Sequence, residues 1–478
     1  MLKKIIKIFW FRYHSISKKI TQYYYNRQMH HHFIHSSKIK GPIKFDIVVP
    51  LFNTKENYFC QMIDSVLNQS YQNWKLILVD ASDHFDLSKL IMRKYDADPR
   101  ITYLKLDNNL GIAGNTNAAF SKVTGDYCVL LDHDDFLELT ALNEVYELIK
   151  TNKTIDLIYT DEDKYDDRAK KYFDPYYKSE PDLYKLRNNN YVCHMLVMSQ
   201  SLLKIVSGEN SQYDGAQDHD LILRCFENAK NIQHISSILY HWRVHEGSTS
   251  ARPDSKTYAY EAGVKAISDH LERCHIYASV NQMSYPGYYE VIYQQQECPD
   301  ILIHSVSDKN DFKSFQSIMK RQAGNVYFMY ENGEIRDERN EEINNNSLLN
   351  AEFLCIINAK YLKLSNCCIE KLVGACSQEQ VASVSGLVVG RFGVVKSFGP
   401  IKTHYDSEIL PFGNNIVTQV VLLLNLNMCC IKTKRIKNIN ILIESINRKK
   451  WILNRKELNI LSDLIMLCNP LCKGYFKY

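Results

Sequence analysis

The feature that most constrains this chain is a regular alternation of short apolar runs with helix-like segments, which begins at Phe45. Residues 45–52 and 74–82 are typical of buried strands, and the segment between them, 57–70, has the pattern of an amphipathic helix. There follow a helix near 87–95, a strand at 101–106, a turn at 107–111, a helix at 115–121 and an apolar strand at 125–131. Strands that alternate with helices predict an α/β fold with a parallel sheet covered on both faces.

Length and charge indicate more than one domain and an unusual N-terminus. A chain of 478 residues exceeds one ordinary core, so two or three domains are expected, and an apolar content of 45% excludes a disordered protein. Residues 1–45 contain ten Lys or Arg and no acidic residue, whereas the remainder carries 48 basic and 54 acidic residues. The fourteen Cys form no CxxC pair, which predicts reduced thiols rather than a disulfide framework or a zinc site.

The basic N-terminal segment, residues 1–44, has the pattern of an amphipathic helix over its first 25 residues. One face is apolar and comprises Leu2, Ile5, Ile6, Phe9, Tyr13, Ile16 and Ile20, and the other comprises Lys3, Lys4, Lys7, Lys18 and Lys19. Such a helix can lie in the plane of a membrane surface, where each Lys near anionic lipid adds about 1 kcal/mol. A helix packed against its own protein is the alternative.

The whole sequence predicts a cytoplasmic protein that is peripheral at the inner face of the cell membrane. No run approaches the roughly 20 apolar residues of a membrane span, and no signal peptide is recognisable. A second basic stretch, residues 432–456, gives weaker support for contact with a membrane surface. A nucleic-acid partner would require basic residues interleaved with a recognition fold, and no such pattern is visible, so we expect no nucleic acid.

Three carboxylates, Asp132, Asp134 and Asp135, follow directly after the apolar run 125–131. Ligands of α/β sheets bind beyond the carboxyl ends of the strands, so Asp80, which ends an earlier strand, should face the same crevice as Asp132. Mg²⁺ and Mn²⁺ prefer carboxylate ligands and keep positions for phosphate oxygens, so the cluster is a candidate site for a metal-bound diphosphate. A solvated loop or a helix cap is the alternative. The chain has no GxGxxG or GxxxxGKS loop, which argues against dinucleotide-binding and P-loop enzymes.

Six blocks of sequence carry a family resemblance, namely VVPLFN, LILVDAS, NNLGIAGNTNAAFSKVTGDYCVLLDHDD, YTDEDK, GAQDHDLILR and YHWRVHEGSTS. In this order they resemble family 2 glycosyltransferases of the GT-A fold. More closely, they resemble the bacterial branch that builds O-antigen, capsule and cell-wall polysaccharides, often as rhamnosyl- or N-acetylglucosaminyltransferases. The resemblance covers residues 45 to about 275 and is specific because all six blocks occur in order.

The resemblance implies a nucleotide-sugar site at the carboxyl edge of the sheet. Pro50 and Phe52 would line the pocket for the base, Asp80 would lie near the base, and Asp132 would lie near the ribose and the metal. Asp134 would be the principal ligand of Mn²⁺ or Mg²⁺. The ion would bridge the phosphates of a UDP- or dTDP-sugar and neutralise charge on the departing diphosphate.

Three further motifs would complete the site. In YHWRVHEGSTS, His245 is suited to a metal and Arg243 to a diphosphate, although a surface loop that packs on the core is the alternative. In GAQDHDLILR, Asp218 matches the acid that serves the family as general base, although helix capping also explains it. In YTDEDK, Asp161 and Asp163 would lie beside the donor sugar or the acceptor, or would be capping or solvated acids.

Two positions depart from the family pattern. Many relatives carry a second acid after the position of Asp80, where this chain has Ala81, so recognition of the base would depend on Asp83 or on backbone groups. The Arg often found in the NxGxxxARN block is replaced by Thr116, which removes one phosphate contact. Relatives of the closer branch are similar at these positions, so neither change suggests an inactive domain.

Residues 288–319 resemble the opening of a second family 2 domain, so we expect a second domain at 285–478 after the first at 45–284. The run 350–375 occupies the place of the acidic strand end, yet Ile357, Asn358, Ala359 and Lys360 stand where carboxylates are expected. The place of the catalytic acid pair, around 455–461, is also basic and poorly matched. We therefore expect a degenerate GT-A-like domain that supports the first domain, an acceptor or a partner. An unrelated α/β domain is the alternative.

Taken together, the sequence predicts a metal-dependent, inverting glycosyltransferase. Its acceptor would be a lipid-linked glycan or a glycosylated protein, and other glycosyltransferases are candidate partners. One alternative is a sugar-phosphate nucleotidyltransferase, which would need a Gly-rich loop with Lys and Arg after the first strand. The other is a non-catalytic scaffold of a glycan-assembly complex.

Overall fold

The computed structural model shows a chain of two compact units. The first comprises Met1–Pro181 and Asn190–His270, and the second comprises Asp182–Asn189 and Leu271–Tyr478. The structure describes residues 38–83, 87–95, 97–245, 257–294, 298–306, 324–337, 339–359, 363–364, 367–389, 395–397, 419–421, 423–425, 428–435, 439–448, 452–454 and 465–475. The predicted N-terminal amphipathic helix therefore lies outside the described residues.

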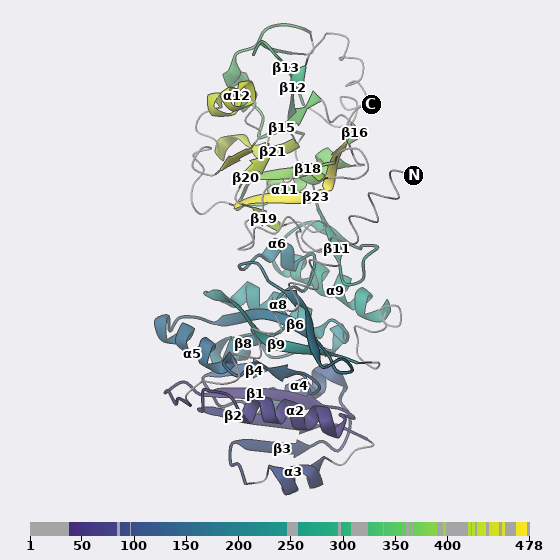
Figure 1. Ribbon diagram of the computed structural model, residues 1–478. Helices are drawn as coiled ribbons and strands as arrows, with labels where there is room; N and C mark the ends of the chain where they lie inside the picture. Colours follow the sequence, from purple (N-terminus) through teal and green to yellow (C-terminus); the bar gives the residue numbers. More distant parts are fainter. Residues whose placement is uncertain are drawn as a thin grey trace, which may run out of the picture. The chain divides into compact units, whose positions relative to one another are not determined.

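One mixed sheet forms the centre of the first unit (Figure 1). Its strands are β1 (Phe45–Leu51), β2 (Trp74–Asp80), β3 (Ile101–Lys105), β4 (Tyr127–Leu130), β5 (Phe136–Leu137), β6 (Leu157–Asp166), β7 (Lys171–Tyr176), β8 (Leu196–Ser199) and β9 (Ile232–Val244). Their order is β3-β2-β1-β4-β8-β6-β9-β5, and β7 pairs with β6. The prediction of a parallel sheet is correct for β1 to β4. It is wrong for β8, which is antiparallel to β4 and β6 because the chain enters β8 at the carboxyl edge of those two strands.

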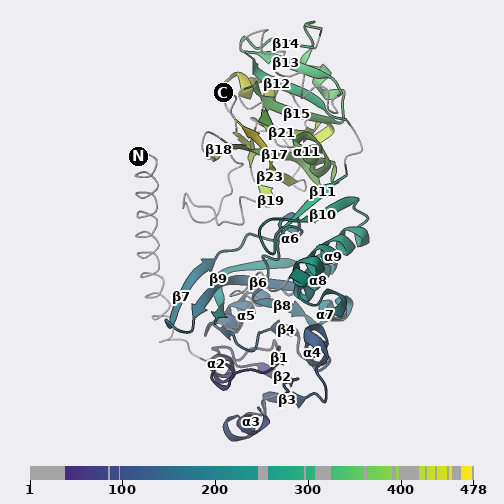
Figure 2. The same ribbon diagram turned by 90° about the vertical axis from the view of Figure 1, so that its right-hand side faces the viewer.

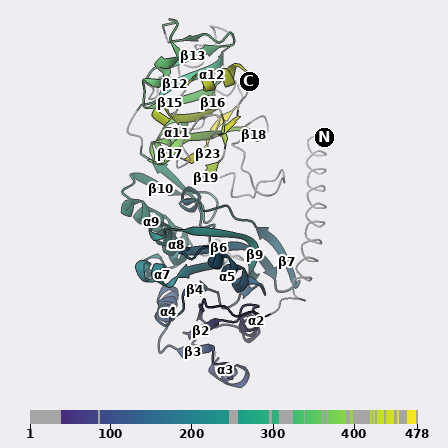
Figure 3. The same cartoon turned by 90° about the vertical axis from the view of Figure 1, so that its left-hand side faces the viewer.

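Helices cover both faces of this sheet, as the alternation predicts. α2 (Glu56–Leu67) and α5 (Ala141–Thr151) lie on one face, and α4 (Gly111–Phe120), α7 (Gln200–Val206) and α8 (Gln217–Asn228) lie on the other (Figures 2 and 3). α3 (Ser88–Lys94) follows β2, and α9 (Thr257–Arg273) follows β9. None of the helices in the described ranges has both the length and the apolarity that crossing a bilayer requires.

The main core lies between the sheet and the pair α2 and α5. Helix α2 buries side chains at helical spacing, namely Phe59, Met62, Ile63 and Val66, and β1 contributes every second residue, namely Phe45, Ile47, Val49 and Leu51. Burial of one such side chain contributes about 1.5–3 kcal/mol. The core therefore fixes β1 and its neighbours, and the site residues emerge from the ends of these strands.

Helix α4 begins earlier than the sequence predicts, at Gly111 rather than near Asn115. Asn115 Oδ1 accepts the backbone N–H of Leu110 at 3.0 Å, and Asn115 Nδ2 donates to Asn109 Oδ1 at 2.9 Å. Asn109 Oδ1 also accepts the N–H of Gly111, whose φ of +78° suits glycine. These side chains organise the first turn, so the helix begins within the predicted turn.

Buried histidine–carboxylate pairs join β6 to β9, which run parallel. His241 Nδ1 lies 2.6 Å from Asp163 Oδ1, and its Nε2 lies 3.3 Å from Glu138 Oε2. His234 Nε2 lies 2.7 Å from Asp161 Oδ1. Asp161 and Asp163 are almost wholly buried. They are therefore not solvated acids, and both pair with histidines of β9 within the sheet. Their place beside a donor sugar or an acceptor stays a prediction.

The second unit contains a further mixed sheet and a separate hairpin of β10 (Ala278–Gln282) and β11 (Tyr289–Tyr293). The predicted boundary near Tyr285 falls inside this hairpin, so the second unit begins earlier, at Leu271. Residues 182–189, with the short helix α6 (Leu183–Leu186), bind the hairpin. The N–H of Tyr289 donates to the carbonyl of Asn188 at 2.8 Å, and Arg187 Nη1 donates to Tyr293 Oη at 3.3 Å.

The larger sheet of the second unit includes β12 (Asp300–Val306), β13 (Val326–Tyr330), β14 (Ile335–Arg336), β15 (Phe353–Asn358), β16 (Lys363–Leu364), β17 (Val381–Val389), β18 (Val395–Ser397), β19 (Gln419–Val421), β21 (Met428–Lys432) and β23 (Ile465–Tyr475). β20 (Leu423–Asn425) pairs with β22 (Ile452–Asn454). Two helices, α11 (Cys368–Ser377) and α12 (Asn440–Asn447), follow β15 and β21. Apolar side chains of α12 pack into one core cluster with those of β12, β15 and β21.

The second sheet repeats the strand arrangement of the first. β13, β12 and β15 are parallel neighbours, β21 is antiparallel to β15 and β17, and β23 is parallel to β17. The first sheet has the same relations among β2, β1, β4, β8, β6 and β9, and the chain visits both sets in the same order. The expected GT-A-like arrangement of the second domain is therefore present.

The place of the catalytic helix in the second unit stays a prediction. α12 follows β21, whereas α7 and then α8 follow β8, and residues 455–461 lie outside the described residues. The first turn of α12 contains no acidic residue. Asn358 ends β15 in the place where the acidic turn follows β4, while Lys360 lies outside the described residues.

The buried pair of His241 with Asp163 predicts a pH-dependent stability. Burial favours the neutral imidazole, but the carboxylates of Asp163 and Glu138 raise the pKa of His241 to about 9. The unfolded value is about 6.5, so the stabilisation is complete below that pH and is lost as the pH rises through 9. We expect the free energy of unfolding of the wild type to fall between pH 6.5 and 9. The same change of pH should cost His241→Gln about 1–3 kcal/mol less.

Urea unfolding at both pH values measures this difference. His275→Asn is the matched control because His275 is exposed and has a positive φ that Asn tolerates. Equal pH dependence in wild type and His241→Gln would contradict a charged, buried His241.

Candidate functional site

The acidic turn after β4 is fixed by the buried carboxyl group of Asp135. Its Oδ2 accepts a 2.6 Å hydrogen bond from Tyr240 Oη, and its Oδ1 accepts the backbone N–H of Arg243 at 2.7 Å. Tyr240 Oη also accepts the N–H of Asp132 at 3.2 Å. Burial is the largest cause that raises the pKa of Asp135 well above its usual value. The carboxylate of Asp134 is the next largest cause, followed by that of Asp132. Asp135 therefore joins the turn to β9.

Two of the predicted metal ligands meet at this turn. His245, the first residue after β9, places Nε2 2.9 Å from Asp134 Oδ2, and the two side chains are 16% and 22% exposed. Asp132 is more open, at 54%, and its Oδ2 lies 3.5 Å from His194 Nε2. Carboxylates with an imidazole are a suitable donor set for a divalent ion such as Mn²⁺. Asp134 and His245 could share an ion, whereas Asp132 does not form one close ligand group with them, so the metal site stays a prediction.

Arg243 is fully buried and supports this pair. Its Nε donates to the carbonyl oxygen of Asp134 at 2.5 Å, and its Nη1 lies 2.9 Å from Asp167 Oδ1. Tyr58 Oη donates to Asp167 Oδ2 at 3.3 Å, and the ring centroids of Tyr58 and His245 are 5.1 Å apart. Among the described residues, Nη2 of Arg243 has no hydrogen-bond partner. The guanidinium thus positions Asp134, and its contact with a diphosphate stays a prediction.

The predicted base-binding residues lie at the ends of β1 and β2. Asp80 is fully buried. Its Oδ2 accepts a hydrogen bond from Tyr103 Oη at 2.7 Å, and its Oδ1 accepts one from the backbone N–H of Ser82 at 2.8 Å. Pro50 is half-buried near the end of β1, and Phe52 just beyond it is 40% exposed. The Asp80 carboxylate thus shapes the loop after β2, and its contact with a base stays a prediction.

Asp218 lies in the first turn of α8, where the sequence predicts it. It is half-buried, and its Oδ2 accepts Asn190 Nδ2 at 2.9 Å while its Oδ1 accepts the N–H of His219 at 2.8 Å. Each carboxylate oxygen has two lone pairs, so the group can still accept a proton from an incoming hydroxyl. Asp220 is instead buried and lies 2.6 Å from Arg224, which makes it structural.

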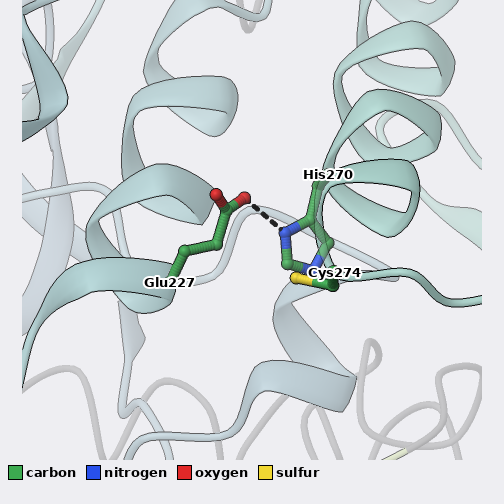
Figure 4. A group of neighbouring side chains, drawn as sticks. All are labelled: Glu227, His270 and Cys274. Atoms are coloured by element: carbon green, nitrogen blue, oxygen red, sulfur yellow. Dashed lines mark hydrogen bonds and ion pairs between the residues drawn. The ribbon is translucent and has the colours of Figure 1, made fainter.

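Helix α8 is anchored to α9, and this fixes the direction of Asp218. Near the end of α8, Glu227 Oε1 lies 2.7 Å from Nδ1 of His270 on α9 (Figure 4). Cys274, also drawn in Figure 4, follows α9 in the chain. Before α8, Tyr213 Oη donates to Asp269 Oδ2 at 2.5 Å.

Three residues of the site, His194, Tyr240 and Asp167, were not predicted. His194 lies near Asp132 and stacks on Tyr240, with 4.8 Å between ring centroids. His194 and Tyr240 lie far in sequence from the acidic cluster that they contact, and Asp167 lies in a turn and reaches the cluster only through Arg243. No local sequence signal marks these three residues.

Comparison with known proteins agrees with the family resemblance of the first four sequence blocks. Residues 46–206 match the model of the family described as Glycosyl transferase family 2. The uncharacterized protein y4gI of Sinorhizobium fredii is 36% identical over 49% of this chain and 26% of its own length. The O-antigen biosynthesis protein RfbC of Myxococcus xanthus is 34% identical over 54% of this chain, which spans 20% of that protein.

A shorter relative is matched over most of its length. The UDP-Glc:alpha-D-GlcNAc-diphosphoundecaprenol beta-1,3-glucosyltransferase WfaP of Escherichia coli is 23% identical over 49% of this chain and 92% of its own length. The three matches each cover about half of this chain.

The contact between Tyr240 and Asp135 predicts a stability loss. Tyr240→Phe removes the hydroxyl that donates to Asp135 and leaves a buried carboxyl oxygen without its donor. We expect the free energy of unfolding to fall by about 1–3 kcal/mol. Urea unfolding measures it, with Tyr146→Phe on α5 as control. A loss equal to that of the control would show that the hydroxyl does not hold the turn.

Proposed function

Because residues 46–206 form a glycosyl transferase family 2 domain, we propose that this chain is an inverting, metal-dependent glycosyltransferase. It moves a sugar from a UDP- or dTDP-sugar to an acceptor hydroxyl during assembly of a bacterial surface polysaccharide or a glycosylated protein. The observation that carries the proposal is the 2.9 Å approach of Asp134 and His245, which are far apart in sequence. Asp218 supplies a second carboxylate in the same unit.

The donor side of the proposed site consists of Asp132, Asp134 and His245, which would hold Mn²⁺ or Mg²⁺. A bound divalent ion supplies charge neutralisation for a departing diphosphate. Arg243 keeps the backbone of Asp134 in place, and its remaining Nη2 donor can bind a phosphate oxygen.

Asp218 acts as general base in the proposed reaction. Its carboxylate takes the proton of the acceptor hydroxyl while the hydroxyl oxygen forms a bond to the anomeric carbon of the donor. The bond from that carbon to the phosphate oxygen breaks, and the nucleoside diphosphate leaves with the electron pair. A single displacement inverts the configuration of the anomeric carbon. Asn190 and the N–H of His219 orient the carboxylate for this step.

The relatives support the proposed class of donor and acceptor. The name of the E. coli relative states a UDP-glucose donor and a diphosphoundecaprenol-linked acceptor, and the name of the M. xanthus relative states O-antigen biosynthesis. We carry over a nucleotide-sugar donor and a lipid-linked glycan acceptor on this basis. Such an acceptor lies at the membrane, which suits peripheral attachment through the basic N-terminal segment.

Among the described residues, the second unit has the central strand arrangement of the first, and Asn358 ends β15 where an acidic turn follows β4 in the first unit. We propose that this unit performs no transfer and binds the acceptor or a partner glycosyltransferase. Its retained sheet provides a scaffold of the same architecture for that role.

The metal ligands can be tested on the purified full chain. A panel of nucleotide-sugars with and without Mn²⁺, scored by nucleoside diphosphate release, should show release that depends on the ion. Asp134→Asn should lower this release by at least about 100-fold, because loss of one electrostatic stabiliser of the leaving group costs about 2.7–4 kcal/mol. Glu147→Gln on the exposed side of α5 is the control. Release by wild type that is independent of metal would contradict the assignment.

The base can be tested separately from the donor site. Asp218→Asn keeps the size of the side chain and one acceptor oxygen but cannot take the proton, so transfer to an acceptor should fall by about 10²- to 10⁴-fold. Binding of the nucleotide-sugar, measured by calorimetry, should stay within about twofold of wild type because Asp218 does not hold the diphosphate. Full transfer by this variant would remove Asp218 as base, and no release from any donor by wild type would favour the scaffold.

A further inference from the structure

Lys178 is a buried cation that joins β6 to the backbone just before β8. Its side chain is fully buried, and Nζ lies 3.1 Å from Glu162 Oε2. Nζ also donates to the carbonyl oxygen of Val192 at 2.9 Å and to that of His194. An ammonium group has three donors, so all of them have acceptors here. Lys178 therefore binds one carboxylate of the sheet and two backbone carbonyls at once.

Further hydrogen bonds fix both partners of this ion pair. Glu162 Oε2 also accepts the backbone N–H of His194, and the backbone N–H of Lys178 donates to Asp161 Oδ1 at 2.8 Å. Glu162 belongs to the YTDEDK block, and the proposed reaction gives it no task. Together these contacts hold the backbone of residues 192–194 against β6.

Residues 190–194, which we call the bridge segment, contact an acid of the proposed site at each end. At one end, Asn190 Nδ2 donates to Asp218 Oδ2 at 2.9 Å. At the other end, His194 Nε2 lies 3.5 Å from Asp132 Oδ2. The imidazole ring of His194 is stacked on Tyr240, with 4.8 Å between the ring centroids and 15° between the planes. One short segment thus contacts the candidate base and a carboxylate of the donor side.

An ion pair at this place is better explained by positioning than by stability. Removing two charges from water costs about as much as their attraction returns, so two well-packed apolar side chains would stabilise the core equally well. Apolar side chains, however, would not bind the carbonyls of Val192 and His194. A buried polar group with all its partners selects one backbone conformation. The pair of Lys178 with Glu162 therefore determines the conformation of the bridge segment.

We propose that Lys178 is a positioning residue, which through the bridge segment fixes Asp132 and Asp218 relative to each other. This inference rests on the proposed transferase function. The acceptor hydroxyl must approach the anomeric carbon opposite the leaving diphosphate, and a misplacement of about 1 Å can lower the rate about 100-fold. Because Lys178 holds a segment that contacts both acids, its loss affects donor binding and transfer together, whereas loss of Asn190 affects transfer alone.

Hydrogen exchange of the full chain, followed by mass spectrometry, tests the structural step without any substrate. Lys178→Met keeps the length of the side chain and removes its three donors, so the amides of residues 190–195 should exchange at least about tenfold faster. Exchange in the first turn of α8, which Asn190 contacts, should also rise. Unchanged exchange of the bridge segment would overturn the proposal.

Arg100→Met is the matched control, because it breaks another ion pair of the same unit. Arg100 Nη2 lies 2.6 Å from Asp98 Oδ2, just before the edge strand β3. This variant should lower the urea midpoint and leave exchange of the bridge segment within about twofold of wild type.

Ligand binding and catalysis separate positioning from a loss of stability. The Kd for UDP or dTDP with Mn²⁺, measured by calorimetry, reports the donor side, and kcat of transfer to an acceptor reports the whole site. Asn190→Ala should lower kcat about tenfold with Kd within about twofold of wild type. Lys178→Met should raise Kd about tenfold and lower kcat about 100-fold. Values equal to those of Arg100→Met in both measurements would overturn the proposal.

A double-mutant cycle tests the bridge segment even if Lys178→Met does not fold. Asn190→Ala and His194→Gln each loosen one end of the same segment. The loss of kcat in the double variant should therefore be smaller than the product of the two single losses by at least about threefold. Losses that simply multiply would show that the two ends act independently, which contradicts a common bridge.

Failure of the transferase function gives a different result. If wild type neither binds UDP or dTDP nor transfers any sugar, the transferase proposal fails, and faster exchange in both the bridge segment and α8 of Lys178→Met would still show that Lys178 holds Asp218 through this segment. If wild type is active and Lys178→Met matches the control in Kd and kcat, only the present inference fails.

Discussion

The geometry of the candidate site depends on the buried carboxyl group of Asp135. It binds the hydroxyl of Tyr240 and the backbone of Arg243, so the acidic turn after β4 and the end of β9 form one assembly. Arg243 then holds Asp134, and His245 follows β9 closely enough to reach the same carboxylate. A buried polar group with all its partners specifies one arrangement, whereas a flexible acidic loop would not.

Local pattern predicted the first half of the sheet and placed Asp132 and Asp134 after a strand, because apolar runs and strand ends are read from neighbouring residues. Asp218 was identified through the family resemblance. Local pattern did not predict the antiparallel β8, since strand direction depends on where the chain re-enters the sheet. Nor did it show that Asp161 and Asp163 would pair with His234 and His241. Such partners lie on another strand and leave no local signal. The same reason concealed the supporting roles of Asp167 and His194.

The two units show which features belong to the fold and which belong to chemistry. From β2 to β9 and from β13 to β23, the two sheets have the same sequence of parallel and antiparallel neighbours, although β3 is parallel to β2 and β14 is antiparallel to β13. The first unit adds carboxylates after β4, where its counterpart β15 ends in Asn358. The architecture therefore needs the apolar pattern and tolerates loss of the acids.

The small segment Asp182–Asn189 belongs to the second unit but is synthesised before the first unit is complete. It lies between two portions of the first unit, yet its partners, the β10-β11 hairpin, come roughly a hundred positions later in the chain. During N-to-C synthesis at about 5–20 residues per second, α6 is therefore made several seconds before the hairpin. Until the hairpin is made, Tyr184 and Leu186, which are buried in the folded chain, are not covered. A fragment that stops at the end of the first unit never covers them, so chaperone capture or aggregation threatens the isolated half more than the complete polypeptide.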